Sequence, residues 1–143
     1  PMKKLLILLF SLFFLSSPSV FAQEDLSKVN IGNLKRLSGS EIISTFSNTL
    51  EIGYQFNGST YLEYKYASGD FSLETDISTT ESGKWKVYDN QICWKSTKKS
   101  HGIPEKMFQC VSIYTDFKEG EYYFYMPGIG VYGKSTSVIP LID

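Results

Sequence analysis

The sequence predicts a mainly β fold of the α+β class, with a short N-terminal helix followed by an antiparallel meander of about eight strands, curled or partly closed into a barrel. Apolar residues recur at every second position from Thr49 onward, which is the period of a half-buried strand. Short turns separate these runs, and no helical stretch lies between them. Because long open sheet edges invite aggregation, a meander of this length favours closure.

The helix is predicted at "SGSE", Ser38 to Glu41, which matches a capping box. Ile42, Ile43 and Phe46 then fall on one face, and Asn48 is a suitable end. The preceding stretch, 26–37, has helical spacing but contains Gly32, so we expect only a weak or broken helix there.

The predicted strands are short and follow one another closely. They are "TLEIGYQF", "STYLEYKY", "FSLETDI", "KWKVY", "QICWK", "MFQCVSIY", "EYYFYM" and "GVYGKSTSVI". Asn57-Gly58 is the strongest short hairpin signal in the chain. Asp89-Asn90 predicts a second tight turn, and Trp85 and Val87 share one strand face.

The first 22 residues have the features of a secretory signal peptide. Lys3 and Lys4 precede an apolar run, and Val20 and Ala22 suit a cleavage site after Ala22. An uncleaved membrane anchor is the alternative, but the run 5–15 is short of the roughly 20 residues that a spanning helix needs. We therefore expect a signal peptide at 1–22, a single β-rich domain at 23–143, a periplasmic or secreted location, and no membrane span after leader cleavage.

The charge balance excludes one class of partner. The 143 residues carry 14 Lys and Arg against 15 Asp and Glu, a formal net charge of −1. Nucleic-acid-binding domains are usually strongly basic, so no nucleic acid is expected.

The two cysteines, Cys93 and Cys110, predict a structural disulfide because an exported protein matures in an oxidising space. If Trp94 and Val111 share the core side of neighbouring strands, both sulfurs lie on the other side, within reach of each other. A metal site would need three or four ligands. The two cysteines and His101 make three, and no convincing fourth ligand is evident. Free or redox-active thiols are the remaining alternative.

No catalytic residue, metal site or cofactor is predicted, and we do not expect an enzyme. Gly128, Gly130 and Gly133 spell G-x-G-x-x-G, but a dinucleotide site would need a helix and a later acid. His101 is the only histidine and has no nucleophile motif. The carboxylates, among them Glu63 and Glu74, fall at expected strand exteriors and turns; a glycosidase pair is compatible with them but not favoured.

A binding surface could involve basic and aromatic residues around the cysteine hairpin and on the strand 121–126. The candidates are Lys84, Lys86, Lys95, Lys98, Lys99, Tyr123 and Tyr125. Such a surface would suit an envelope protein or an anionic polymer. The alternative is structural, because lysines protect strand edges and tyrosine is a common strand residue.

The order of these motifs supports a resemblance to a known family. "LSG" before the short helix, "YLEYKYASGDF", "GKWKVYDNQICW" and "FQCVSIY" together resemble an uncharacterised family of small exported proteobacterial proteins with a G-x-W element and two cysteines. The resemblance covers about 37–125 and implies structural roles for Gly83, Trp85, Cys93 and Cys110, with no known activity. Small periplasmic β-barrel protease inhibitors also combine G-x-W with a disulfide, but here a helix-like region precedes the sheet and the G-x-W falls late.

The first functional hypothesis is an exported, non-catalytic binding or inhibitor-like module of the bacterial envelope. The alternatives are a small-ligand carrier within a partly closed β-barrel, or a carboxylate-based envelope hydrolase. A filled core with surface patches would favour the module, and an internal cavity would favour the carrier. A deep pocket with two facing acids would favour the hydrolase.

Overall fold

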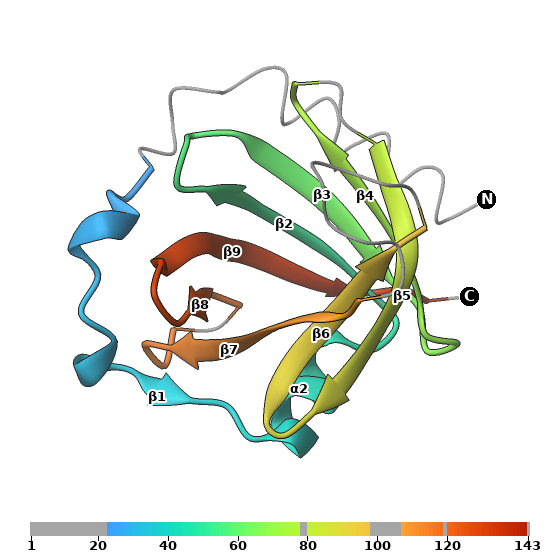
Figure 1. Cartoon of the computed structure of the whole chain (residues 1–143), viewed down its shortest axis with the longest axis horizontal. Coiled ribbons are helices and arrows are strands. Elements are labelled where there is room, and N and C mark those ends of the chain that lie inside the picture. Colours follow the sequence, from blue (N-terminus) through green and yellow to red (C-terminus); the bar gives the residue numbers. More distant parts are fainter. Residues whose placement is uncertain (1–22, 78–79, 98–106, 119, 143) are drawn as a thin grey trace.

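Eight consecutive antiparallel strands close into a barrel in the computed structural model, which describes residues 23–77, 80–97, 107–118 and 120–142 (Figure 1). The barrel strands are β2 (Thr49–Gln55), β3 (Thr60–Lys65), β4 (Asp70–Thr75), β5 (Thr80–Tyr88), β6 (Gln91–Ser96), β7 (Gln109–Thr115), β8 (Tyr122–Met126) and β9 (Gly130–Pro140). Each strand pairs with the next along the chain, and β9 pairs with β2. The expected meander is confirmed, and it closes fully.

Tight turns connect the strands as their residue types predict. Asp89 and Asn90 both have positive φ, which suits a two-residue hairpin turn. The hairpin at Asn57-Gly58 has a three-residue loop rather than a two-residue turn. The backbone N–H of Gln55 donates to the Ser59 carbonyl and closes this loop. Gly58, with φ of 86°, provides the left-handed position that such a loop requires.

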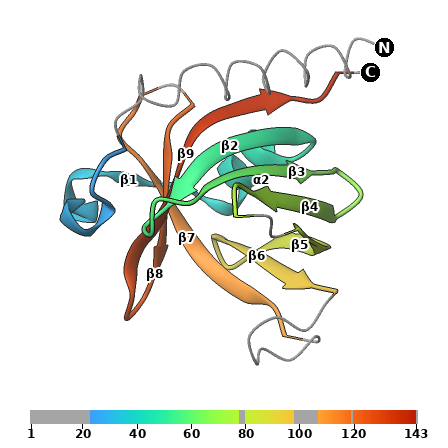
Figure 2. The ribbon, with the colours of Figure 1, turned by 90° about the horizontal axis from the view of Figure 1, so that it is seen from above.

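The predicted helix, α2 (Gly39–Phe46), packs against one end of the barrel, and Figure 2 shows it behind β2 and β3. Its capping box forms as expected, since Ser38 Oγ accepts from the Glu41 N–H and the Glu41 carboxylate accepts from the Ser38 N–H. Ile42 and Phe46 are completely buried in the barrel core. Ile43 was expected on the same face but is 51 % exposed, because the short helix turns only a narrow stripe inward.

The segment before the helix is not a regular helix, in agreement with the break expected at Gly32. It forms two short 3₁₀ turns, η1 (Leu26–Lys28) and η2 (Ile31–Asn33), and a two-residue strand, β1 (Lys35–Arg36), that pairs with β7. Figure 1 shows this blue segment running outside the barrel. Leu26 packs there against Tyr54 and Tyr123, so the segment covers the outer face of β2 and β8.

The apolar core fills the half of the barrel nearest α2. It contains Leu37, Ile42, Phe46, Phe71, Trp85, Ile92, Val111, Ile113 and Phe124. The C-terminal ends of β2, β4, β6 and β8 lie at the opposite end, because successive strands of the meander run in alternating directions. The helix thus closes one end of the barrel.

Candidate functional site

A cavity of about 250 Å³ lies inside the barrel. Its lining extends to Gln55 at the end of β2, Ser96 at the end of β6 and Met107 just before β7, all at the end away from α2. Met107 is 60 % exposed, so the cavity reaches solvent on this side. Pockets for small molecules are typically concave, mostly apolar and equipped with a few polar groups.

The cavity has one polar and one mainly apolar wall. The polar wall comes from β2, β3 and β9 and comprises Glu51, Gln55, Tyr61, Glu63, Lys65 and Tyr132. The apolar wall, from β4 to β8, comprises Phe71, Leu73, Trp85, Ile92, Trp94 and Phe124. Glu81, Ser96 and Gln109 add polar atoms to this second wall. The arrangement suits a molecule with an apolar body and a polar end.

An ion-pair cluster forms the polar wall. Lys65 Nζ lies 2.7 Å from Glu51 Oε1 and also contacts Glu63 Oε2, while the Tyr61 hydroxyl donates to Glu51 Oε2. The side chains of Lys65 and Glu51 are only 6 % and 1 % exposed. A buried charge is tolerated only when it is paired and hydrogen-bonded, which this cluster achieves.

Strand register explains why these side chains meet. Glu51 on β2 lies directly opposite Glu63 on β3, so both carboxylates point into the barrel. Lys65 follows two positions later on the same face, as the period of a strand requires. Lys65 Nζ also lies 5.4 Å from the ring centroid of Phe46, so the buried helix forms the floor beneath the cluster.

The protonation equilibria of this wall are shifted. Burial raises the pKa of Glu63 above its usual 4.5, the nearby carboxylates add to the rise, and Lys65 partly offsets it. Burial alone would lower the pKa of Lys65, but Glu51 and Glu63 outweigh it, so this pKa lies above its usual value. Burial and the Glu51 carboxylate also raise the pKa of Tyr61.

The glycine of the G-x-W element and its tryptophan shape the apolar wall. A Cβ on Gly83 would lie 2.0 Å from the backbone oxygen of Lys95, so only glycine fits beside β6. Trp85 is 8 % exposed and donates its indole N–H to the Tyr66 carbonyl at 2.9 Å. Gly83 thus allows the close approach of β5 and β6, and Trp85 is held in place by its hydrogen bond while lining the cavity.

The disulfide is present between Cys93 and Cys110, which lie directly opposite each other on β6 and β7. Their Cα atoms are 4.0 Å apart. Trp94 lines the cavity and Val111 is fully buried. This confirms the prediction that the two residues lie on the core side of their strands. The disulfide therefore fixes the β6–β7 pairing at the apolar wall.

The predicted surface lysines that the structure describes share the outer face of β5 and β6, where Lys84 lies directly opposite Lys95 and Lys86 is two positions further along β5. Lys84 pairs with Asp70 at 2.5 Å, whereas Lys86 and Lys95 lie over the Phe108 ring, at 4.1 and 4.9 Å from its centroid. Lys98, Lys99 and His101 lie outside the described residues. The described lysines therefore lie next to one another on the outer face of the barrel, with Lys84 bound to Asp70 and the other two beside Phe108.

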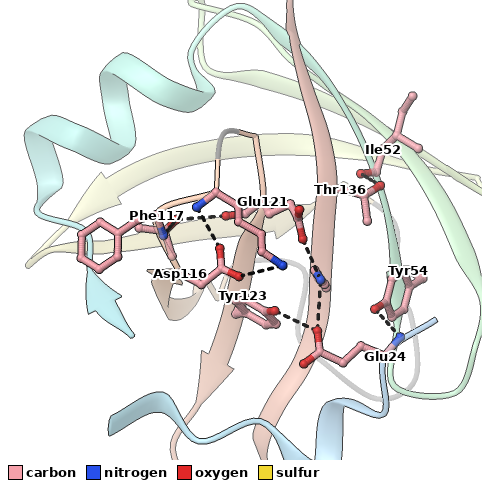
Figure 3. A network of polar contacts seen from close by, with 11 residues as sticks. Glu24, Ile52, Tyr54, Asp116, Phe117, Glu121, Tyr123 and Thr136 are labelled. Atoms are coloured by element: carbon pink, nitrogen blue, oxygen red, sulfur yellow. Dashed lines mark hydrogen bonds and ion pairs between the residues drawn. The ribbon is translucent and has the colours of Figure 1, made fainter. Parts of the chain in front are cut away.

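Tyr123 and Tyr125 share an outer strand face, as their alternation predicts, but Tyr123 is only 4 % exposed. Figure 3 shows Tyr123 and Tyr54 pointing toward Glu24. The Tyr123 hydroxyl donates to Glu24 Oε1 at 2.8 Å, and the Tyr54 hydroxyl accepts from the Glu24 N–H at the same distance. Tyr123 therefore anchors the N-terminal segment and offers little surface to a partner.

Lys134 completes this outer network. Its ammonium lies 3.0 Å from Glu24 Oε1 and 2.8 Å from Glu121 Oε1. Burial and the bond to Glu24 raise the pKa of Tyr123 to about 12. The network joins the residue pair just before η1 to β8 and β9 through Glu24, and we interpret it as structural.

The cavity acids are the residues that sequence reasoning missed. Glu63 was expected at a strand exterior or turn, yet Glu63 and Glu81 both line the interior. The sequence contained a signal for this. A hairpin centred near Asn57-Gly58 sets Glu51 opposite Glu63. Two facing acids repel each other, so the pair indicates a nearby cation such as Lys65. Within the described residues, no group of three or more His, Cys, Asp or Glu side chains could hold a metal ion.

Comparisons with family models, curated proteins and solved structures find no match for this chain. Within the described ranges, no helix is long and apolar enough to cross a membrane.

Proposed function

We propose that this protein is an exported, non-catalytic binding protein that carries a small amphiphilic molecule inside its β-barrel. The observation that carries the proposal is the internal cavity, with a charged wall facing an aromatic wall. A carrier needs a preformed concave site with few, well-placed polar groups. The disulfide supports the exported location, since such bonds persist in oxidising compartments.

The geometry favours a carrier over a surface-binding module. Of the predicted surface residues that the structure describes, Lys84 is paired with Asp70 and Tyr123 is buried under the N-terminal segment. The interior, by contrast, contains a cavity with charged and aromatic walls. An apolar group bound there would be removed from water, which favours binding.

The geometry also argues against a hydrolase that would use Glu51 as one of its two acids. A paired-carboxylate mechanism needs both acids to reach the substrate. Glu51 is 1 % exposed, and its two oxygens are taken by Lys65 and Tyr61. Glu51 is therefore positioned to hold the wall together rather than to attack a bond.

Tryptophan fluorescence can test the proposal directly, because both tryptophans of the chain line the cavity. We would titrate the protein with three two-ring probes of similar shape: naphthylmethylamine, naphthylmethanol and naphthoic acid. At least one should change the fluorescence saturably and raise the melting temperature, since a ligand that binds only the folded state stabilises it.

A matched pair of variants locates the binding. Ser96→Phe adds a ring to the cavity lining and should abolish the response, whereas Ser82→Phe adds the same ring on the outer face of β5 and should not. The carrier proposal would be wrong if none of the probes binds, or if Ser96→Phe binds as well as the native protein.

A further inference from the structure

The cavity contains an excess of negative charge. Glu51 lies opposite Glu63, Glu63 lies opposite Leu73, and Leu73 in turn lies opposite Glu81. Three carboxylates thus occupy one level of the barrel across β2 to β5, and all three line the cavity. Among the described lining residues, Lys65 is the only cation, so the cavity keeps a net negative charge when its acids are ionised.

Glu63 is more accessible to a bound molecule than Glu51. Its side chain is 18 % exposed, against 1 % for Glu51, and its contact with Lys65 is made through Oε2. Burial and the neighbouring acids disfavour its charged form, as its raised pKa indicates. A cation placed beside Glu63 would restore the ionised form and gain a charge-assisted hydrogen bond.

The opposite wall suits an apolar body with a positive end. Trp85, Trp94 and Phe124 present aromatic surface to the cavity. The indole N–H of Trp85 is already bonded to the Tyr66 carbonyl, so the ring offers its faces rather than its donor. Aromatic faces attract cations, and the attraction grows when water is excluded.

An anionic ligand would meet the reverse situation. Its carboxylate would approach Glu63 and Glu81. Lys65, the one cation among the described lining residues, already binds two acids. Like charges in a poorly solvated site repel strongly. A neutral ligand would gain the apolar contacts but would leave the excess charge uncompensated.

We infer that the carried molecule is an organic cation, an amine with an aromatic or compact apolar body, whose ammonium group binds Glu63 and whose body lies against Trp85, Trp94 and Phe124. The inference rests on the proposed carrier function and adds the charge of the ligand to it.

The test compares the same three naphthalene probes, now by isothermal titration calorimetry at neutral pH. Naphthylmethylamine should bind about tenfold or more tightly than naphthylmethanol, which corresponds to one charge-assisted hydrogen bond, and naphthoic acid should bind most weakly. If the neutral or anionic probe binds as tightly as the amine, the cation inference is wrong while the carrier proposal stands. If no probe binds, the carrier proposal itself fails.

Variants then assign the site. Glu63→Gln should remove most of the preference for the amine and leave the affinity for naphthylmethanol nearly unchanged. Glu81→Gln should reduce the preference for the amine less. Because this variant leaves the contacts of Lys65 intact, it keeps the test possible if Glu63→Gln folds poorly. The control, Glu74→Gln, removes an exposed carboxylate on β4 and should retain the full preference. An unchanged preference in both cavity variants would contradict the assignment.

Discussion

Glu51 and Glu63 lie opposite each other on neighbouring strands and bind the same ammonium group, that of Lys65. Two facing carboxylates inside a barrel would repel each other strongly without it. Lys65 is therefore required both for the stability of the barrel and for the shape of its polar wall.

Replacing Lys65 with Met should lower the free energy of unfolding by about 3–5 kcal/mol, because two buried carboxylates lose their partner. Lys84→Met is the control, since Lys84 pairs with Asp70 at the exposed surface and should contribute at most about 1 kcal/mol. Urea unfolding of both variants measures the difference. Equal losses would show that the interior ion pairs contribute no more than a surface pair.

The raised pKa of Glu63 predicts a specific pH dependence. Because the folded state holds this proton more tightly than the unfolded state, its contribution to stability is complete below the usual pKa of 4.5 and is lost as pH rises through the folded-state value. Native protein should thus lose stability relative to Glu63→Gln as pH rises above 4.5. Unfolding curves at a series of pH values test this, and an opposite slope would mean that Lys65 outweighs burial.

The disulfide should stabilise the fold without taking part in binding. Replacing Cys93 and Cys110 together with Ala should cost about 3 kcal/mol, as expected for closing a loop of 17 residues. Probe binding should persist at a temperature where the variant is folded. A thiol assay on denatured, unreduced native protein should find no free sulfhydryl, and two titratable thiols would contradict the disulfide.

Gly83 should tolerate no side chain. Gly83→Ala places a Cβ against the Lys95 backbone oxygen and should destabilise by about 1–3 kcal/mol, or prevent folding, because the β5–β6 pairing must shift. In Gly133→Ala the new Cβ would have ordinary contacts of 3.6 Å or more, so this control should change stability far less. Thermal unfolding followed by circular dichroism distinguishes the two variants.

The capping box should contribute measurably to the helix that closes the barrel. Ser38→Ala removes the acceptor for the Glu41 N–H and should cost about 1 kcal/mol. The hydrogen bond from the Ser38 backbone N–H lowers the pKa of Glu41 to about 2, and Lys35 adds to this effect. The contribution of the Glu41 carboxylate to folding stability should therefore be lost as pH falls from 4.5 toward 2. Ser44→Ala, on the exposed side of the helix, is the matched control. Chemical unfolding at neutral pH should separate them.

The sequence by itself determined the features that depend on neighbouring residues. Strands, turns and helix could be predicted because their signals act within a few positions of the chain. These signals are the alternation of apolar and polar residues, the turn residues Asp89 and Asn90, and the capping box at Ser38. The cysteine pair was also predictable, because its two strands are joined by one loop. The near-complete agreement over these elements reflects the local origin of their signals.

Closure of the barrel and the inward face of β3 were decided only by the tertiary structure. In β3, one face carries Tyr61, Glu63 and Lys65, and the other carries Leu62 and Tyr64, so alternation alone favours the second face as the buried one. Pairing of β9 with β2, far apart in sequence, closes the barrel. Glu51, from β2, then pairs with Lys65 inside the barrel, and the charged face of β3 becomes stable in the interior because this partner comes from another strand.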